Sequence, residues 1–165
     1  MATPQMAPAP AGPSSAAVQA AARIHSGANW FLWIAGLSLV NSAVVIFGGS
    51  FHFVVGLGVT SVVDVIAKQV GGVGTILAIV INGFVAGVFV LFNRFAMKAQ
   101  MKAQKWAFAV GMAVYAADGL LLFAAKDILS VAFHAYALYC IYRGMAAVSQ
   151  WEAAKRAPGT AALAS

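Results

Sequence analysis

The sequence contains very few charged residues. Ten Lys or Arg and four Asp or Glu make up 8% of its 165 residues, whereas about a quarter of a typical soluble domain is charged. Hydrophobic residues account for 62% of the chain, and its mean hydropathy is +0.88. These values exclude an ordinary soluble enzyme, and also a disordered chain, which needs more charge and fewer apolar residues. The composition predicts a small membrane protein that crosses the bilayer several times.

Cysteine and the common catalytic motifs are also lacking. Cys140 is the only cysteine, so no intrachain disulfide and no cysteine-based metal site can form. The sequence has no glycine-rich phosphate loop, zinc-binding helix motif or nucleophile elbow. The histidines are predicted at different depths, so two of them cannot ligate one haem within the chain; they are His25, His52 and His134. A haem shared by two copies of His134 in a dimer stays open. We otherwise expect no metal, no cofactor and no catalytic residue, which argues against an enzyme.

Four apolar runs are long enough for membrane-spanning helices, each of which needs about 20 residues. They cover 28–48, 72–93, 106–125 and 128–148, and Ser26 is a suitable N-cap for the first. We therefore predict an all-α, four-span antiparallel transmembrane bundle formed by residues 23–156. The Ala- and Pro-rich residues 1–22 lack the basic start of a signal peptide. They are expected to be a disordered tail, and residues 157–165 a flexible one.

The segment between the first two runs is less apolar. As a helix over about 54–69, it places several valines on one side and Thr60, Ser61 and Asp64 on the other. Asp64 and Lys68 have the spacing of a helical ion pair on the surface. This pattern favours an interfacial or re-entrant helix over a fifth span. The valines, with Gly56 and Gly58, also leave a strand open.

Basic residues indicate the orientation of the predicted bundle. The connection between the second and third runs has no acidic residue and holds Arg94, Lys98, Lys102 and Lys105. The positive-inside rule places this connection, and hence both termini, in the cytoplasm. As one helix, its basic residues form a stripe suited to anionic lipid headgroups. Basic residues divided among short segments do not favour nucleic acid, and the composition suggests a bacterial inner membrane.

Small residues recur at the spacing used in helix packing. Gly83 and Gly87 form a GxxxG step, and the same spacing joins Ala109, Ala113 and Ala117, and Ser38 and Ser42. Small side chains allow helix backbones to approach closely in lipid. We interpret these positions as contacts within the chain, with a dimerisation face as the alternative.

Polar residues inside the predicted spans form the candidate site. They are Asn41, Asn82, Tyr115, Asp118, Ser130 and His134. Asp118 and His134 are equally distant from the turn near Lys126, so in an antiparallel hairpin they lie at the same depth, about 12 Å along each helix. We predict that they meet if their helix faces agree. The pair is interpreted as a polar bridge between helices, or as a proton-accepting site.

The apolar composition and the buried polar residues lead to two hypotheses for the function. The leading hypothesis is a non-enzymatic accessory or assembly subunit in the membrane, as a homo-oligomer or with a partner membrane subunit. The alternative is a proton-linked or small-solute transport unit built around Asp118 and His134.

Overall fold

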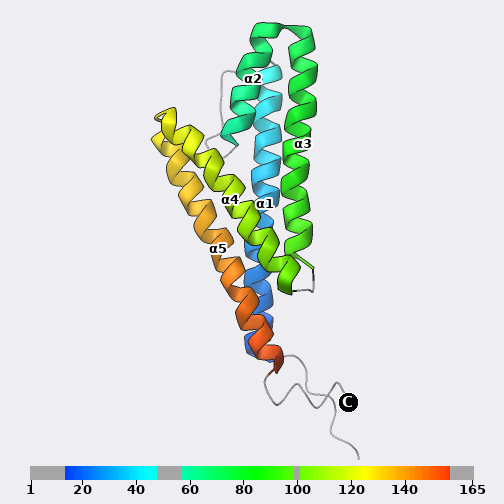
Figure 1. The fold of residues 1–165 in the computed structure, drawn as a ribbon, viewed down its shortest axis with the longest axis vertical. Helices are drawn as coiled ribbons and strands as arrows, with labels where there is room; N and C mark the ends of the chain where they lie inside the picture. Colours follow the sequence, from blue (N-terminus) through cyan, green and yellow to red (C-terminus); the bar gives the residue numbers. More distant parts are fainter. Residues whose placement is uncertain (1–13, 48–56, 99–100, 157–165) are drawn as a thin grey trace, which may run out of the picture.

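A computed structural model describes residues 14–47, 57–98 and 101–156, and over these residues the chain is helical (Figure 1). The five helices are α1 (Ser15–Ile46), α2 (Gly58–Val70), α3 (Gly72–Ala96), α4 (Met101–Ala124) and α5 (Ile128–Arg156). The all-α prediction is confirmed, and the described residues contain no strand. Residues 54–56 of the predicted short helix, His52 and the predicted tail 157–165 lie outside the described residues.

The first helix is longer than the sequence pattern suggested. It starts at Ser15, inside the predicted tail, and the Ser14 hydroxyl caps it by accepting a hydrogen bond from the Ala17 N–H at 3.3 Å. Ser26 therefore lies within α1 and is not its N-cap. Alanine favours helix strongly, and Ala20 and Ile24 are buried. Packing against α5, which itself extends to Arg156, stabilises this additional helix.

Glycines allow the closest contact between α1 and α5. A Cβ added to Gly27 would lie 2.6 Å from the Gly144 Cα, so the two backbones touch. Near this crossing, the buried ring of Phe31 packs against Phe92 and Phe108, with centroids 5.8 and 6.0 Å away. The core is therefore aromatic at this level of the bundle.

The small-residue packing predictions are partly wrong. Gly83 and Gly87 are exposed, and a Cβ added to either would meet no atom within 4 Å. The alanine stripe is also exposed, at Ala109, Ala113 and Ala117. A different face of α4 is buried, which includes Ala107, Phe108, Gly111 and Tyr115. Only Ser38 and Ser42 pack as expected, because each takes part in a buried hydrogen bond.

The start of α2 lies beside the interior of α1. The Leu57 N–H donates to the Ser38 Oγ at 2.8 Å, so α2 does not begin beyond the end of α1 at Ile46. Farther along both helices, Ser42 and Asp64 contact the same side chain of α3. The two helices therefore run in the same direction. Gly71, with φ of +82°, then turns the chain back into α3, a conformation that suits glycine.

The polar face of α2, which was predicted to lie at the surface, is buried. Its buried residues include Thr60 and Asp64, whereas Val62, Val65, Ile66 and Val70 are more than half exposed. Asp64 is only 3% exposed, and the ion pairs of the described residues do not join it to Lys68. The predicted surface ion pair is wrong. Periodicity assigned the residues to two faces, but contacts with the other helices decide which face points inward.

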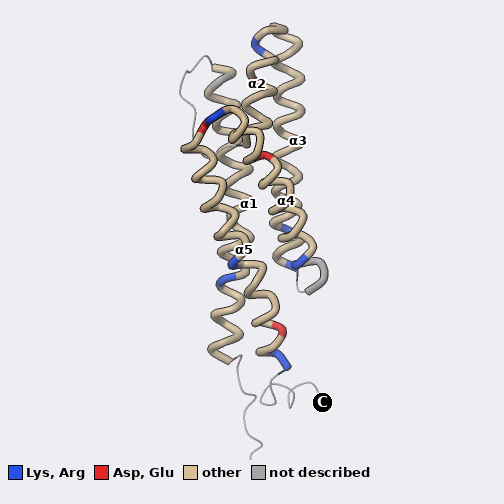
Figure 2. The backbone as a smooth tube through the Cα atoms, turned by 60° about the vertical axis from the view of Figure 1, so that its left-hand side comes forward, with Lys and Arg blue, Asp and Glu red and all other residues tan. Residues whose placement is uncertain are grey.

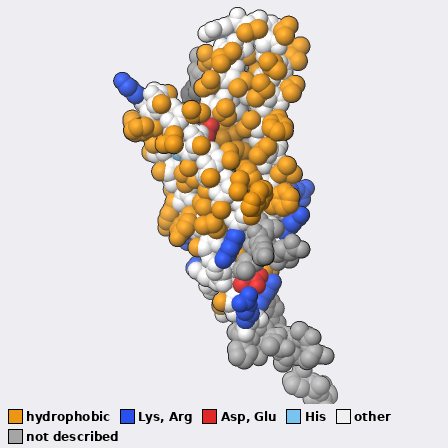
Figure 3. Space-filling model, in the orientation of Figure 1, with side chains coloured by type: hydrophobic (Ala, Val, Ile, Leu, Met, Phe, Trp, Pro, Cys, Tyr) orange, Lys and Arg blue, Asp and Glu red, His pale blue; other side chains and the backbone are white. Residues whose placement is uncertain are grey.

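The face of the bundle seen in Figure 3 carries many apolar side chains. Large exposed side chains include Val73, Ile76, Phe84, Leu120 and Phe123, each more than 60% exposed. Within the described residues, two helical stretches are long and apolar enough to cross a membrane, Gly72–Ala96 and Gln104–Ala124. Length and composition therefore do not confirm all four predicted spans. α5 carries Arg143, His134 and three tyrosines, which make it more polar than α3.

Lys and Arg gather towards the end of the bundle that contains the α3–α4 connection (Figure 2). Arg94, Lys98 and Lys105 are exposed there, whereas the side chain of Lys102 lies outside the described part of the chain. The predicted continuous basic stripe is wrong, because α3 ends at Ala96 and a turn separates it from α4. Lys98 instead folds over the Phe95 ring, 4.3 Å from its centroid.

Candidate functional site

All of the polar residues predicted inside the bundle are buried. Each is at most 5% exposed: Asn41, Asn82, Tyr115, Asp118, Ser130 and His134. The structure divides most of them between two groups. One group surrounds Asp118 where α4, α5 and the start of α2 meet, and the other surrounds Asn82 between α1, α2 and α3.

Asp118 and His134 are in direct contact. The His134 Nε2 lies 3.0 Å from the Asp118 Oδ2, and both side chains are buried. The depth predicted from the turn is therefore correct, and the two helix faces agree. Gly119 lies against the same imidazole, because a Cβ there would be 3.3 Å from the His134 Cδ2.

The hydrogen bonds of His134 determine where its protons lie. Its Nδ1 is 2.9 Å from the Ser130 carbonyl oxygen, which can only accept, so Nδ1 carries a proton. The Nε2 faces a carboxylate oxygen that also only accepts when ionised. A hydrogen bond between these two atoms therefore requires one further proton between Nε2 and Oδ2.

Asp118 also caps the N-terminus of α2. The Gly58 N–H donates to Oδ2 at 2.7 Å, and the Val59 N–H donates to Oδ1 at 2.8 Å. These groups would otherwise lack partners, because Leu57 at the N-cap position has no side-chain acceptor. The positive end of the helix dipole further favours a carboxylate here. The carboxylate is therefore held by donors from both α2 and α5.

This cap was not predicted from the sequence. The signal was the absence of Ser, Thr, Asp or Asn at the N-cap position of α2, which implies that a distant acceptor serves the first N–H groups. Gly58 permits the close approach, because a Cβ there would lie 2.9 Å from the Leu122 Cγ on α4.

Tyr115 and Ser130 contribute less directly than predicted. The Tyr115 ring stacks on the His134 ring, with centroids 4.1 Å apart and an interplanar angle of 14°. The buried Tyr115 hydroxyl has no hydrogen-bond partner. The Ser130 hydroxyl and N–H both donate to Asp127, which caps α5 and whose pKa they lower. Only the backbone carbonyl of Ser130 serves the Asp118–His134 pair.

The second polar group contains a residue that the sequence analysis placed at the surface. The Asn82 Nδ2 donates to the Ser42 Oγ at 2.8 Å and to the Asp64 Oδ1 at 2.6 Å. The Oδ1 of the same amide is buried and has no partner. Asp64 could have been recognised from its position one turn after Thr60 on the polar face of α2. Asn41 is buried on α1.

Comparisons with known protein families, with curated protein sequences and with solved structures find no match to this chain. In the described residues, no group of three or more His, Cys, Asp or Glu side chains is arranged to hold a metal ion.

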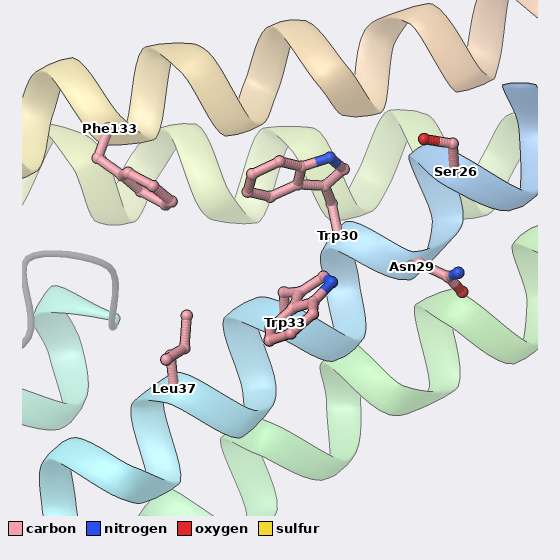
Figure 4. A pocket seen from close by; sticks show the side chains of 6 residues that line it. All are labelled: Ser26, Asn29, Trp30, Trp33, Leu37 and Phe133. Atoms are coloured by element: carbon pink, nitrogen blue, oxygen red, sulfur yellow. The ribbon is translucent and has the colours of Figure 1, made fainter.

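A hollow on the outside of the bundle is separate from both polar groups. Trp30, Trp33 and Leu37 of α1 line it together with Phe133 of α5 (Figure 4). Trp33 is 63% exposed, and Trp30 stacks edge-on against Tyr136 at a centroid distance of 5.5 Å. Ser26 and Asn29 complete the lining. The hollow thus offers aromatic surface and two polar side chains, and no charged group.

Proposed function

We propose that this chain is an integral membrane protein in which α1, α3, α4 and α5 cross the bilayer. The surface supports this proposal, because large apolar side chains face outward while eleven polar or charged residues of the described ranges are buried. α2 supports it most strongly, since that helix buries Thr60 and Asp64 and exposes valines and Ile66. Water would favour the opposite orientation, whereas lipid favours apolar side chains outside.

In this arrangement α2 is a re-entrant helix. It begins at the depth of Ser38 within α1 and runs to the end of the bundle where α3 begins. A helix N-terminus inside a bilayer needs internal partners for its N–H groups, because no water is available there. The Ser38 hydroxyl accepts a hydrogen bond from the Leu57 N–H, and the Asp118 carboxylate accepts hydrogen bonds from the N–H groups of the next two residues. The Asp118–His134 pair then has a structural role, which is to hold α2 in the membrane.

For the function, we propose a subunit of a membrane assembly that associates with another transmembrane helix through α3. The observation that carries this proposal is the outward-facing GxxxG step at Gly83 and Gly87 on α3. A Cβ added to either glycine meets no atom within 4 Å in the described part of the chain. Small residues at this spacing let a second helix approach closely. That helix belongs to another copy of this chain or to a partner subunit.

Substitution of Gly83 and Gly87 by isoleucine tests the association. The Gly83→Ile and Gly87→Ile variants should fold normally, because a Cβ there meets no atom within 4 Å, but they should lose cross-linking to their neighbour in the native membrane. Gly36→Ile is the matched control, since Gly36 on α1 is equally open. Differently tagged copies separate self-association from a foreign partner. Unchanged cross-linking in both variants would refute the role of this step.

The proposed topology places the α3–α4 connection and both termini in the cytoplasm, in a bacterial inner membrane, where Arg94, Lys98, Lys102 and Lys105 contact anionic headgroups. In a Cys140→Ser background, cysteine at Lys105 should be labelled only from the cytoplasmic side, and cysteine at Lys68 only from the other side. Labelling of both from one side would contradict the topology.

A second candidate function is proton-linked transport at Asp118 and His134. The observation that favours it is the single proton that their hydrogen-bond geometry requires. Asp118→Asn keeps the size of the side chain but cannot accept that proton. A folded Asp118→Asn variant that has lost proton coupling in vesicles would support transport, whereas full activity in Asp118→Asn and His134→Gln would leave the pair structural.

A further inference from the structure

The two buried aspartates have very different surroundings. Asp118 accepts two backbone N–H groups and pairs with His134. Asp64 is equally buried, yet among the described residues its one side-chain hydrogen bond comes from Asn82. The ion pairs of the described residues do not include Asp64. A carboxylate inside an apolar medium without a positive partner is costly, so Asp64 calls for a cation.

Asn82 contributes a second oxygen that lacks a partner. Both hydrogens of its amide are used, one towards Ser42 and one towards Asp64. The carbonyl oxygen of this amide is left without a donor, although Asn82 is only 1% exposed. Buried polar atoms in native proteins nearly always have a partner, and an ion is one explanation for an orphan. Here the orphan oxygen belongs to the same amide that touches the unpaired carboxylate.

Thr60 adds a third oxygen on the same face of α2. It lies one helical turn before Asp64, and both side chains are buried. The Thr60 hydroxyl donates its proton to the Leu57 carbonyl at 2.7 Å, which leaves the lone pairs of its oxygen free to coordinate. Thr60 and Asp64 therefore lie one turn apart on the same buried face of α2, and Asp64 accepts a hydrogen bond from Asn82 of α3.

We propose that Asp64, Asn82 and Thr60 bind a sodium ion between α2 and α3. The donors are all oxygens, which suit hard cations and not zinc or copper. The site carries a single negative charge, so a monovalent ion neutralises it, whereas calcium sites use several carboxylates. A sodium ion here would join the re-entrant helix to α3, just as Asp118 joins its N-terminus to α4. This inference goes beyond the subunit role and does not depend on it.

Thermal unfolding of the purified protein in detergent tests the site. Sodium chloride should replace choline chloride at constant ionic strength and pH, with unfolding followed by circular dichroism. Because sodium binds the folded state, the melting temperature should rise by about 5 °C or more at a hundredfold excess over the dissociation constant. Potassium chloride should raise the melting temperature less than sodium chloride does at each concentration. A wild-type protein that responds equally to sodium, potassium and choline would overturn the proposal.

Substitutions of the proposed ligands test where the sodium ion binds. Asp64→Asn should abolish the sodium-dependent rise, and the exposed Asp127→Asn control should retain it. If Asp64→Asn does not fold, Thr60→Val decides, because it keeps the shape of the side chain and removes one ligand. The Thr60→Val variant should then need about tenfold more sodium for the same rise in melting temperature. This factor corresponds to about 1.4 kcal/mol, which is the strength of one hydrogen bond and is taken here for the lost oxygen ligand. An unchanged sodium response in Asp64→Asn, or in Thr60→Val, would refute this location.

Discussion

Replacing Asp118 by alanine should destabilise the protein by about 3–5 kcal/mol, which is the usual effect of removing one partner of a buried charge pair. The substitution leaves the Gly58 and Val59 N–H groups and the imidazole of His134 without an acceptor in a buried site. Each buried group that loses its partner costs about 1–3 kcal/mol. Structural relaxation at the start of α2 keeps the total destabilisation below the sum of the costs of these three groups.

Asp118→Asn should have an intermediate effect. Its amide oxygen can still accept the Val59 N–H, and its amide nitrogen can donate to a neutral His134. That nitrogen then faces the Gly58 N–H, which leaves one buried donor unsatisfied and costs about 1–3 kcal/mol. Asp127→Ala is the matched control, because Asp127 also caps a helix but is exposed. Loss of that cap should cost only about 1 kcal/mol.

The assay is reversible unfolding in mixed micelles, followed by circular dichroism and tryptophan fluorescence. Hydrogen exchange provides a second readout. In Asp118→Ala, exchange should accelerate first at the start of α2, because that helix has lost its anchor while α3 and α5 keep their packing. An Asp118→Ala variant that is no less stable than Asp127→Ala, or whose α2 amides remain as protected as in the wild type, would refute the anchoring role of Asp118.

Three further predictions follow from local contacts. Gly144→Val should destabilise the fold by at least about 1–3 kcal/mol, because its Cβ would lie 2.8 Å from the Gly27 Cα. A melting temperature equal to that of the wild type would contradict this contact. Tyr115→Phe should be neutral or stabilising in the same measurement, since the buried hydroxyl has no partner, and a clear loss of stability would reveal one. Hydrogen bonds from Ser130 lower the pKa of Asp127 in the folded state. The cap therefore contributes its full stability above the unfolded-state pKa of about 3.9. This stability is lost as the pH falls through the lower pKa of the folded state. Asp127→Asn should remove this acid-dependent part of the melting curve, and an identical pH profile in the variant would show that the cap does not titrate as described.

The sequence by itself determined the approximate position of the helices and the relative depth of residues on either side of a short turn. The start of α3 at Gly72 and that of α5 at Ile128 match the predicted runs. Glycines and turn residues interrupt the apolar pattern there, which is local information. The pairing of Asp118 with His134 was also predictable, because a short turn around Lys126 fixes the relative depth of two antiparallel helices.

Local information did not extend to the ends of α1. Its alanine-rich start has good helix propensity, but an isolated helix of that composition is marginal in water. Contact with α5 through Gly27 and Gly144 and the bond from Arg23 to Gln150 stabilise it. Those partners are more than a hundred residues away in the chain.

Only the tertiary structure decided which face of each helix points inward. Helical periodicity places Thr60 and Asp64 opposite the valines of α2, but it leaves the rotation of the helix about its axis open. That rotation depends on neighbours. Asn82 of α3 binds Asp64 on the polar face, and Ser38 of α1 and Asp118 of α4 accept the backbone N–H groups at the start of α2. The same ambiguity placed Gly83 and Gly87 inside the bundle, although they lie outside. Hydrogen bonds need defined partners and apolar contacts do not, so the partners of the few buried polar groups set the orientation of the helices.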